Sequence, residues 1–151
     1  MACDKLQEFL DRNQVKYISI KHSPAFTAQE IAASAHIPGQ EVAKTVVVKL
    51  DGELALVVLP APEMVRMEHL KAETGAQRVE LASEEEFRDR FPDCEVGAMP
   101  PFGNLYGMDT YVEKSLTGDE EIAFNGGTHT ELVKMAFSDY RSLTQPKILR
   151  G

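Results

Sequence analysis

One lysine stands at the start of the most apolar stretch of this chain. Lys44 precedes Thr45 and three consecutive valines, and Asp51-Gly52 then leads into a second apolar run that ends at Leu59. β-Branched residues favour strands, and Asp-Gly favours a two-residue hairpin turn because both of its positions need positive φ. Burying an unpaired ammonium is costly, so the Lys44 side chain should reach water or a cleft. In a cleft it could bind an anion; the plain alternative is a strand-end lysine that extends its amine to solvent.

Two glycine-bearing segments could also contact a ligand, because glycine lets backbone N–H groups approach closely. The segment from Gly97 to Gly103 contains Pro100-Pro101, and it could present N–H donors to a carbonyl oxygen that becomes an oxyanion. The other segment, Asn125-Gly126-Gly127, follows a predicted strand. A tight connecting turn explains either segment equally well.

Other kinds of active site are not indicated. The sequence has no G-x-S-x-G or G-x-x-x-x-G-K-[ST] motif, and its four histidines lack the spacing of metal ligands. The run Glu84-Glu85-Glu86 is typical of a helix N-terminus rather than of a catalytic cluster. We therefore expect neither a metal ion nor a cofactor.

Composition sets the broad class of the protein. A chain of 151 residues with 43% hydrophobic residues suits one domain, and it has no stretch apolar enough to cross a membrane. The N-terminal residues carry no signal-peptide pattern, and the two cysteines, Cys3 and Cys94, fit a reducing compartment, so we expect a cytoplasmic protein. A net charge of −8 argues against non-specific nucleic-acid binding but allows a local basic patch. Candidates for such a patch are Lys21, His22, Lys49, Lys134 and Arg141.

Periodicity and cap signals predict helices and strands that mix without a strict alternation of strand and helix. Helices are expected at 3–13, 27–35, 67–74, from Ser83 to before Phe91, and after a cap at Ser138. Strands are expected at 15–20, 42–50, 53–59, 77–81, 110–112, 121–124 and 130–135. The whole chain, 1–151, should form one domain, with loosely held tails at 1–3 and 144–151.

Four segments resemble, in their order, the YbaK and prolyl-tRNA synthetase editing-domain family. They are 43–49, 97–103, 108–109 and 124–129, and the resemblance extends from about Leu6 to about Leu143. It implies an α/β fold of the α+β type, with a strongly bent, mostly antiparallel mixed sheet surrounded by helices. It also implies a free-standing deacylase that acts in trans on the 3′ acceptor end of a mischarged tRNA. The expected substrate is of the tRNA-Pro type and carries a small wrong residue such as alanine, cysteine or serine; a cognate synthetase is a second expected partner.

The resemblance also implies roles for individual residues. Lys44 would hold the 3′-terminal adenosine, the loop from Gly97 to Pro101 would stabilise the ester carbonyl, and His129 would orient the substrate or the water nucleophile. Substrate contacts are further implied at His22, Thr45, Met99, Pro101, Phe102, Gly103, Asp109, Asn125, Gly126, Gly127 and Thr128. Asn125 stands where YbaK-like members often have serine, so the sequence leaves open which amino acid and which tRNA are recognised.

Two other functions fit the same residues. One is a non-catalytic module of this fold that binds tRNA or a synthetase without turnover. The other is a small-molecule or partner-binding domain with no role in RNA biology. Stoichiometric binding without hydrolysis would favour the first, and failure to bind an acceptor stem at low salt would favour the second. The oligomeric state is not indicated by the sequence.

Overall fold

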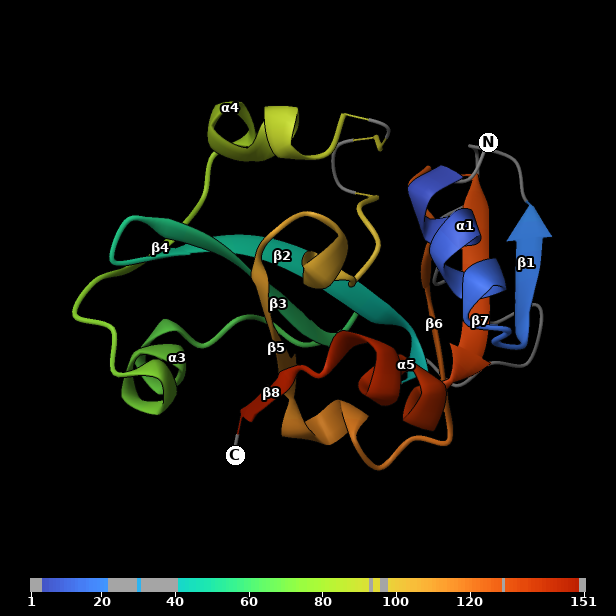
Figure 1. The fold of residues 1–151 in the computed structure, drawn as a ribbon. Coiled ribbons are helices and arrows are strands. Elements are labelled where there is room, and N and C mark those ends of the chain that lie inside the picture. Colours follow the sequence, from blue (N-terminus) through green and yellow to red (C-terminus); the bar gives the residue numbers. More distant parts are fainter. Residues whose placement is uncertain are drawn as a thin grey trace.

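The computed structural model describes residues 4–21, 30, 41–92, 94–95, 98–128 and 130–149 (Figure 1). The α-helices in these residues are α1 (Asp4–Arg12), α3 (Met67–Thr74), α4 (Glu84–Phe87) and α5 (Phe137–Thr144). The strands are β1 (Tyr17–Lys21), β2 (Ala43–Leu50), β3 (Glu53–Pro60), β4 (Val79–Leu81), β5 (Asp109–Glu113), β6 (Glu121–Asn125), β7 (Glu131–Ala136) and β8 (Lys147–Leu149). Short 3-10 helices are η2 (Arg88–Arg90), η3 (Gly103–Leu105) and η4 (Lys114–Leu116). The helix predicted to begin at Thr27 lies outside the described residues, apart from Glu30.

The strands form two sheets. Five strands have the order β4-β2-β3-β5-β8, and three have the order β1-β7-β6. The pairs β3–β5 and β5–β8 are parallel, whereas the other named pairs are antiparallel. A parallel bridge between Val42 and Ala123 joins the two sheets where β2 begins. The predicted class, an α+β domain with a bent, mostly antiparallel mixed sheet and surrounding helices, is therefore confirmed, with the bend at this bridge.

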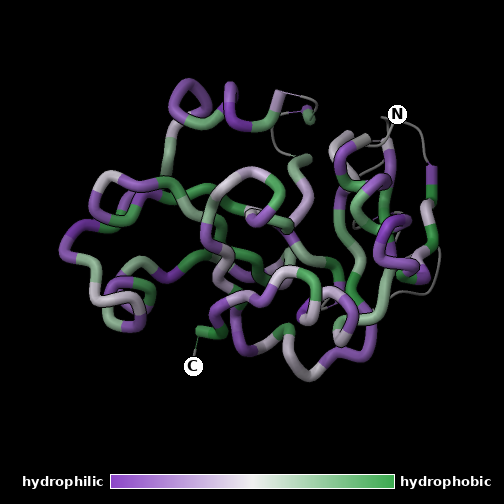
Figure 2. Tube along the Cα trace, viewed as in Figure 1, coloured by the Kyte–Doolittle hydropathy of each residue, from purple (hydrophilic) through white to green (hydrophobic). Residues whose placement is uncertain are grey.

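The main apolar core fills the space between the two sheets, and α1 and α5 close it. At its centre the ring of Phe102 lies 5.6 Å from that of Phe124 and 5.2 Å from that of Tyr140. A second cluster lies on the other face of the five-stranded sheet, where Leu70 of α3 packs on β2 and β3. Figure 2 shows hydrophobic strands in the interior, while the region of α4 is largely hydrophilic. No helix among the described residues is long and apolar enough to cross a bilayer.

Several local predictions are confirmed by backbone geometry. Asp51 and Gly52 have φ values of 50° and 88°, as the tight hairpin turn requires. Gly75 ends α3 with φ of 75°, and Ser83 and Glu86 form the predicted capping box at the start of α4. The last helix differs from the prediction, because α5 begins at Phe137 after Ala136 and has no side-chain cap from Ser138.

Residues 144–149 include regular structure, although the sequence suggested a loose tail over 144–151. Thr144 is the last residue of α5, and Lys147–Leu149 form β8. Leu149 pairs with Glu113 in the parallel register and is only 2% exposed. The physical reason is that β5 has a free edge on this side, and pairing with it satisfies the backbone while Leu149 is buried.

Candidate functional site

Lys44 and Asn125 lie on the same face of two adjoining strands. Val42 of the segment leading into β2 pairs in parallel with Ala123 of β6. Side chains alternate along a strand, so residues two positions beyond the bridge on each strand share one face. Lys44 and Asn125 are those residues. The first and the last segments that the sequence singled out are therefore brought together at the seam between the sheets.

Lys44 differs from the other partly buried lysines in having no acidic partner. Of the lysines in the described part of the chain, Lys44, Lys49 and Lys134 are partly buried. Lys49 contacts the Glu86 carboxylate, and Lys134 lies 3.3 Å from a Glu121 oxygen. No carboxylate of the described residues lies within 4.0 Å of the Lys44 amine. A half-buried ammonium without a neighbouring carboxylate can bind an anionic group of a ligand.

The glycine loop packs against the segment Asn125-Gly126-Gly127. The Gly127 N–H donates to the Ala98 carbonyl over 2.9 Å, and the Gly127 carbonyl accepts from the Glu95 N–H over 2.7 Å. Glu95 and Ala98 flank Gly97 in the chain, although Gly97 lies outside the described residues. The backbone on both sides of Gly97 is thus fixed to the segment that ends β6.

The model of the aminoacyl-tRNA editing domain family matches residues 22–143 of this sequence. The chain belongs to this family. The matched range includes Lys44, Gly97 and Asn125, so the family model spans the seam between the sheets. The resemblance to the YbaK and prolyl-tRNA synthetase editing domains is confirmed.

Two kinds of relative are similar to this editing domain. Proline–tRNA ligases from Bacillus mycoides (strain KBAB4) and Bacillus cereus (strain AH187) are each 33% identical over 94 residues, which is 62% of this chain. The match spans only 14% of the length of each ligase. Among solved structures, a protein proposed to be a trans-editing enzyme for prolyl-tRNA synthetase superposes with a TM-score of 0.82 at 19% identity, over 97% of this chain and 93% of its own. A hypothetical protein reaches 0.81 at 19% identity, over 95% and 96%. At these identities the structures show the shared fold.

Most backbone donors in the described part of the editing domain's glycine loop are already used. The N–H groups of Ala98, Phe102 and Gly103 donate to oxygen atoms within the protein over 2.8 to 3.0 Å. The two prolines between them have no N–H group. These three donors are therefore not available to a ligand carbonyl.

The side chains that follow in the loop are interior. Phe102 is fully buried in the aromatic core, Met99 is 5% exposed, and Gly103 is buried as the first residue of η3. The carbonyl of Pro101 accepts a hydrogen bond of 2.7 Å from the Tyr140 hydroxyl. The resemblance linked these residues to the substrate, and in the structure their burial and this hydrogen bond anchor the loop to the core.

Thr45 and Asp109 are not brought together with Lys44. Thr45 points to the opposite face of β2, the face that Ala43 and Val47 bury in the main core. Asp109 pairs with Ala55, which is four residues from Leu59, the partner of Lys44 on β3. Four residues of strand span about 13 Å. The exposed Asp109 carboxylate instead lies 3.4 Å from the Lys147 amine.

The remaining predicted residues divide between the described and undescribed parts of the chain. Thr128 is half-buried beside the turn, with its hydroxyl 3.2 Å from that of Thr130. His22 and His129, like Gly97, lie outside the described residues.

Glu131 is a residue at this turn that sequence reasoning missed. It is 2% exposed, and its Oε2 has no hydrogen-bond partner among the described residues. Its carbonyl accepts from the Gly126 N–H over 3.0 Å, and a Cβ placed on Gly126 would lie 3.2 Å from Oε2 and 2.9 Å from Val133 Cγ2. A carboxylate on the inward side of an apolar strand was the available signal. Glu131 and Val133 leave room only for glycine at position 126.

Acidic side chains gather at the far end of β6 from Asn125. Burial raises the pKa of Glu41, and the nearby Asp119 and Glu121 carboxylates raise it further, while Lys134 lowers it. Burial also raises the pKa of Asp119. The start of β6 thus carries several carboxylates, and Asn125 lies at the other end of this strand.

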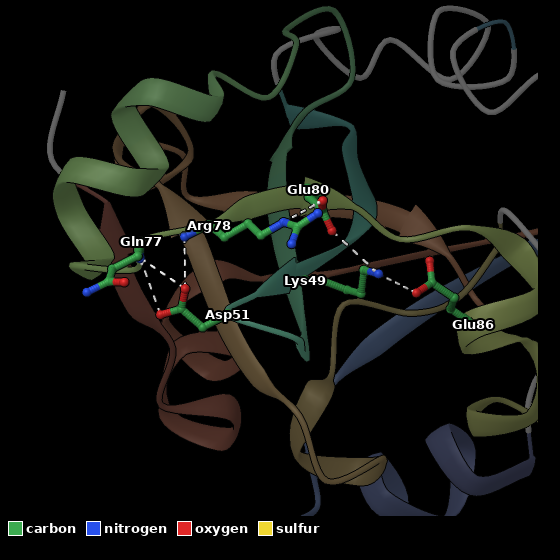
Figure 3. A network of polar contacts seen from close by, with 6 residues as sticks. All are labelled: Lys49, Asp51, Gln77, Arg78, Glu80 and Glu86. Carbon is green, nitrogen blue, oxygen red and sulfur yellow. Dashed lines mark hydrogen bonds and ion pairs between the residues drawn. The ribbon is translucent and has the colours of Figure 1, made fainter.

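The largest of five pockets in the described part of the chain lies at the other end of β2 from Lys44. It has a volume of about 630 Å³, and its lining residues are Lys49, Gly52, Glu53, Leu54, Glu86, Arg90 and Gly107. Figure 3 shows the Lys49 amine between the carboxylates of Glu80 and Glu86, so its charge is already neutralised. Within the described residues, no three His, Cys, Asp or Glu side chains are placed to hold a metal ion. This pocket is therefore a poor candidate for binding an anionic substrate.

Proposed function

We propose that this editing domain hydrolyses, in trans, the ester that joins a wrong amino acid to the 3′ end of a tRNA. The observation that carries the proposal is the half-buried Lys44, which has no carboxylate within 4.0 Å among the described residues and shares a face with Asn125. Membership of the aminoacyl-tRNA editing domain family supports it.

Each group at the seam has a role in this mechanism. The Lys44 ammonium binds the phosphate or ribose of the 3′-terminal adenosine. The backbone around Gly97 donates to the ester carbonyl as it becomes an oxyanion, and Asn125 holds the acyl group or the attacking water. His129 assists in orienting the substrate. Water is the nucleophile and no acyl-enzyme forms, so positioning and electrostatic stabilisation supply most of the rate.

The proposed substrate is tRNA of the proline type that carries alanine, cysteine or serine. The similarity to proline–tRNA ligases supports the choice of tRNA. The aminoacylation site of a synthetase discriminates against a slightly smaller side chain by only about 1–3 kcal/mol, so a separate hydrolytic site is needed to remove the error. A proline-specific synthetase is accordingly the proposed partner, and the cytoplasm the proposed location.

A deacylation screen tests the proposal. Purified protein is incubated with alanyl-, cysteinyl- and seryl-tRNA of the proline type, and release of the amino acid is followed. We expect release from at least one species and its abolition in Lys44→Ala. Lys16→Ala is the matched control, because Lys16 is exposed and lies outside the seam. Full activity of Lys44→Ala would remove the lysine from the mechanism, and stoichiometric tRNA binding without any release would make the domain a binding module.

A further inference from the structure

A small cationic pocket lies apart from the seam. Lys114 of η4, Arg141 of α5, Ile148 of β8 and Thr117 line a pocket of about 470 Å³. Lys114 and Arg141 are exposed, and neither has a carboxylate within 4.0 Å among the described residues. The Thr117 hydroxyl donates to the Lys114 carbonyl over 2.6 Å, which fixes the turn that carries the lysine. An anion entering this pocket would meet two positive charges.

Four other pockets lack this property, because each has at least one carboxylate in its lining. The acidic lining residues are Asp51, Glu53, Glu86, Asp109, Asp119 and Glu120. In the largest pocket the lysine is held between two carboxylates, as Figure 3 shows. Asp119 and Glu120 belong to a neighbouring pocket that shares Arg141 and Thr117, so the positive potential is greatest on the Lys114 side. Of these pockets, the one lined by Lys114 and Arg141 has positive and no negative side chains in its lining, which favours a polyanion.

The cationic pocket is at the same end of the five-stranded sheet as Lys44. Lys44 pairs with Leu59 on β3, and the β3–β5 register places Val58 beside Val112. The residue after Val112 is Glu113, so Lys44, Leu59 and Glu113 form a row across three strands, and Lys114 follows directly. Two strand spacings amount to about 10 Å. Lys44 faces the side of the sheet where Leu59 is buried, whereas Arg141 and Ile148 lie on the side of the main core. A chain of phosphates whose end is bound at Lys44 would therefore pass around this end of the sheet to reach the pocket.

We propose that Lys114 and Arg141 bind the phosphodiester backbone of the RNA whose 3′-terminal adenosine lies at Lys44. The placement of that adenosine rests on the proposed function; the cationic pocket itself does not. Guanidinium and ammonium groups are the usual phosphate ligands, and such contacts position an RNA without reading its sequence. With a net charge of −8, the protein needs a local site of this kind to hold a polyanion.

The test compares two double variants of the full chain. Lys114→Ala/Arg141→Ala removes the proposed site, and Lys71→Ala/Arg88→Ala removes the same charge from two exposed cations elsewhere. Binding of an acceptor-stem RNA hairpin that carries no amino acid is measured by fluorescence anisotropy over a series of salt concentrations. For the first variant we expect roughly tenfold weaker binding at low salt, and a slope of log K against log salt that is smaller by about 1.4 to 1.8. The control should match the wild type, and thermal melts should show that both variants are folded.

Two further measurements separate this proposal from others. Hydrolysis of an aminoacylated adenosine, which has no phosphodiester that could contact the pocket, should be the same in the Lys114→Ala/Arg141→Ala variant as in the wild type. If the wild type hydrolyses nothing but the hairpin still binds through Lys114 and Arg141, the deacylase proposal fails and this one stands. Unchanged hairpin affinity in the Lys114→Ala/Arg141→Ala variant would overturn the RNA-binding proposal. So would an NMR titration in which resonances of the pocket shift with inorganic phosphate but not with the hairpin.

Discussion

Lys44 and Asn125 share one face of two adjoining strands, two residues beyond the parallel bridge between Val42 and Ala123. The lysine begins a hairpin of the five-stranded sheet, and the asparagine ends a strand of the three-stranded sheet. The relative position of the two side chains therefore depends on how the sheets join. Val42 and Ala123 are both buried at that join, which suits a site that works by positioning.

Replacing Asn125 tests whether its amide takes part in the reaction. We expect Asn125→Ala to lower kcat/KM for the mischarged tRNA by about tenfold or more, because it removes a polar group beside the reacting ester. Asn104→Ala is the matched control: Asn104 is exposed, and its amide makes only a long bond of 3.4 Å to the Leu143 carbonyl. Steady-state kinetics on both variants, with melting curves, decide the question. Equal kinetics in the two variants would show that the Asn125 amide takes no part in the reaction.

Gly126 is required by close packing. A methyl group on it would lie 2.9 Å from Val133 Cγ2 and 3.2 Å from Glu131 Oε2, both on the next strand. We expect Gly126→Ala to lower the free energy of unfolding by about 1–3 kcal/mol, as overpacking does. Urea denaturation measures this change.

The control for this substitution is Gly118→Ala, because a Cβ on Gly118 would have no heavy atom within 4 Å. Its stability should be unchanged or slightly higher. The double variant Gly126→Ala/Val133→Ala should be less destabilised than the sum of its single changes, since Val133→Ala removes the nearer clash. Strict additivity would show that the clash is relieved in some other way.

The hairpin of β2 and β3 could be predicted from the sequence because its signals are local. Consecutive valines favour a strand, and Asp51-Gly52 adopts the two positive φ values that the turn needs. Lys44 and Asn125 were each singled out by their own segments. Their shared face could not be derived, because it depends on the bridge between Val42 and Ala123, two residues far apart in the chain.

The parts of the site that the sequence could not predict depend on tertiary burial. Phe102 follows two prolines in a glycine loop, but its ring is in the core against Phe124 and Tyr140. Asp109 precedes a strand, and only the parallel register with β3 shows that it lies at the far end of the sheet from Lys44. Lys114 has no motif around it. It lines the same pocket as Arg141 only because η4, α5 and β8 come together in the fold.

The pair formed by Lys49 and Glu86 should make stability depend on pH in the acid range. The hydrogen bond from Lys49, with further bonds from Ser83, lowers the pKa of Glu86 from 4.5 to about 2. A carboxyl group with a lowered pKa stabilises the fold fully above its unfolded value, and this contribution is lost as the pH falls from about 4.5 towards 2. Glu86→Gln should therefore be less stable than the wild type at neutral pH, and the difference should shrink below pH 4.5.

Urea denaturation of the Glu86→Gln variant between neutral pH and pH 3 measures this. Glu85→Gln is the control, because Glu85 is exposed on the same helix and has no ion-pair partner among the described residues. Its difference from the wild type should be small at every pH. A Glu86→Gln difference that stays constant with pH would mean that the Lys49 contact does not shift the Glu86 pKa in solution.

Asp109 offers the sharpest test of which family positions act in this chain. Its carboxylate is exposed and contacts Lys147 at the end of β5 away from Lys44, so Asp109→Asn should change kcat/KM for mischarged tRNA by less than about twofold. An exposed pair contributes little, so stability should fall by no more than about 1 kcal/mol. Lys147→Met breaks the same pair from the other side and should have the same small effect on stability and none on the reaction. A tenfold loss of kcat in Asp109→Asn but not in Lys147→Met would place the carboxylate at the substrate, and the seam at Lys44 would then be only part of the site.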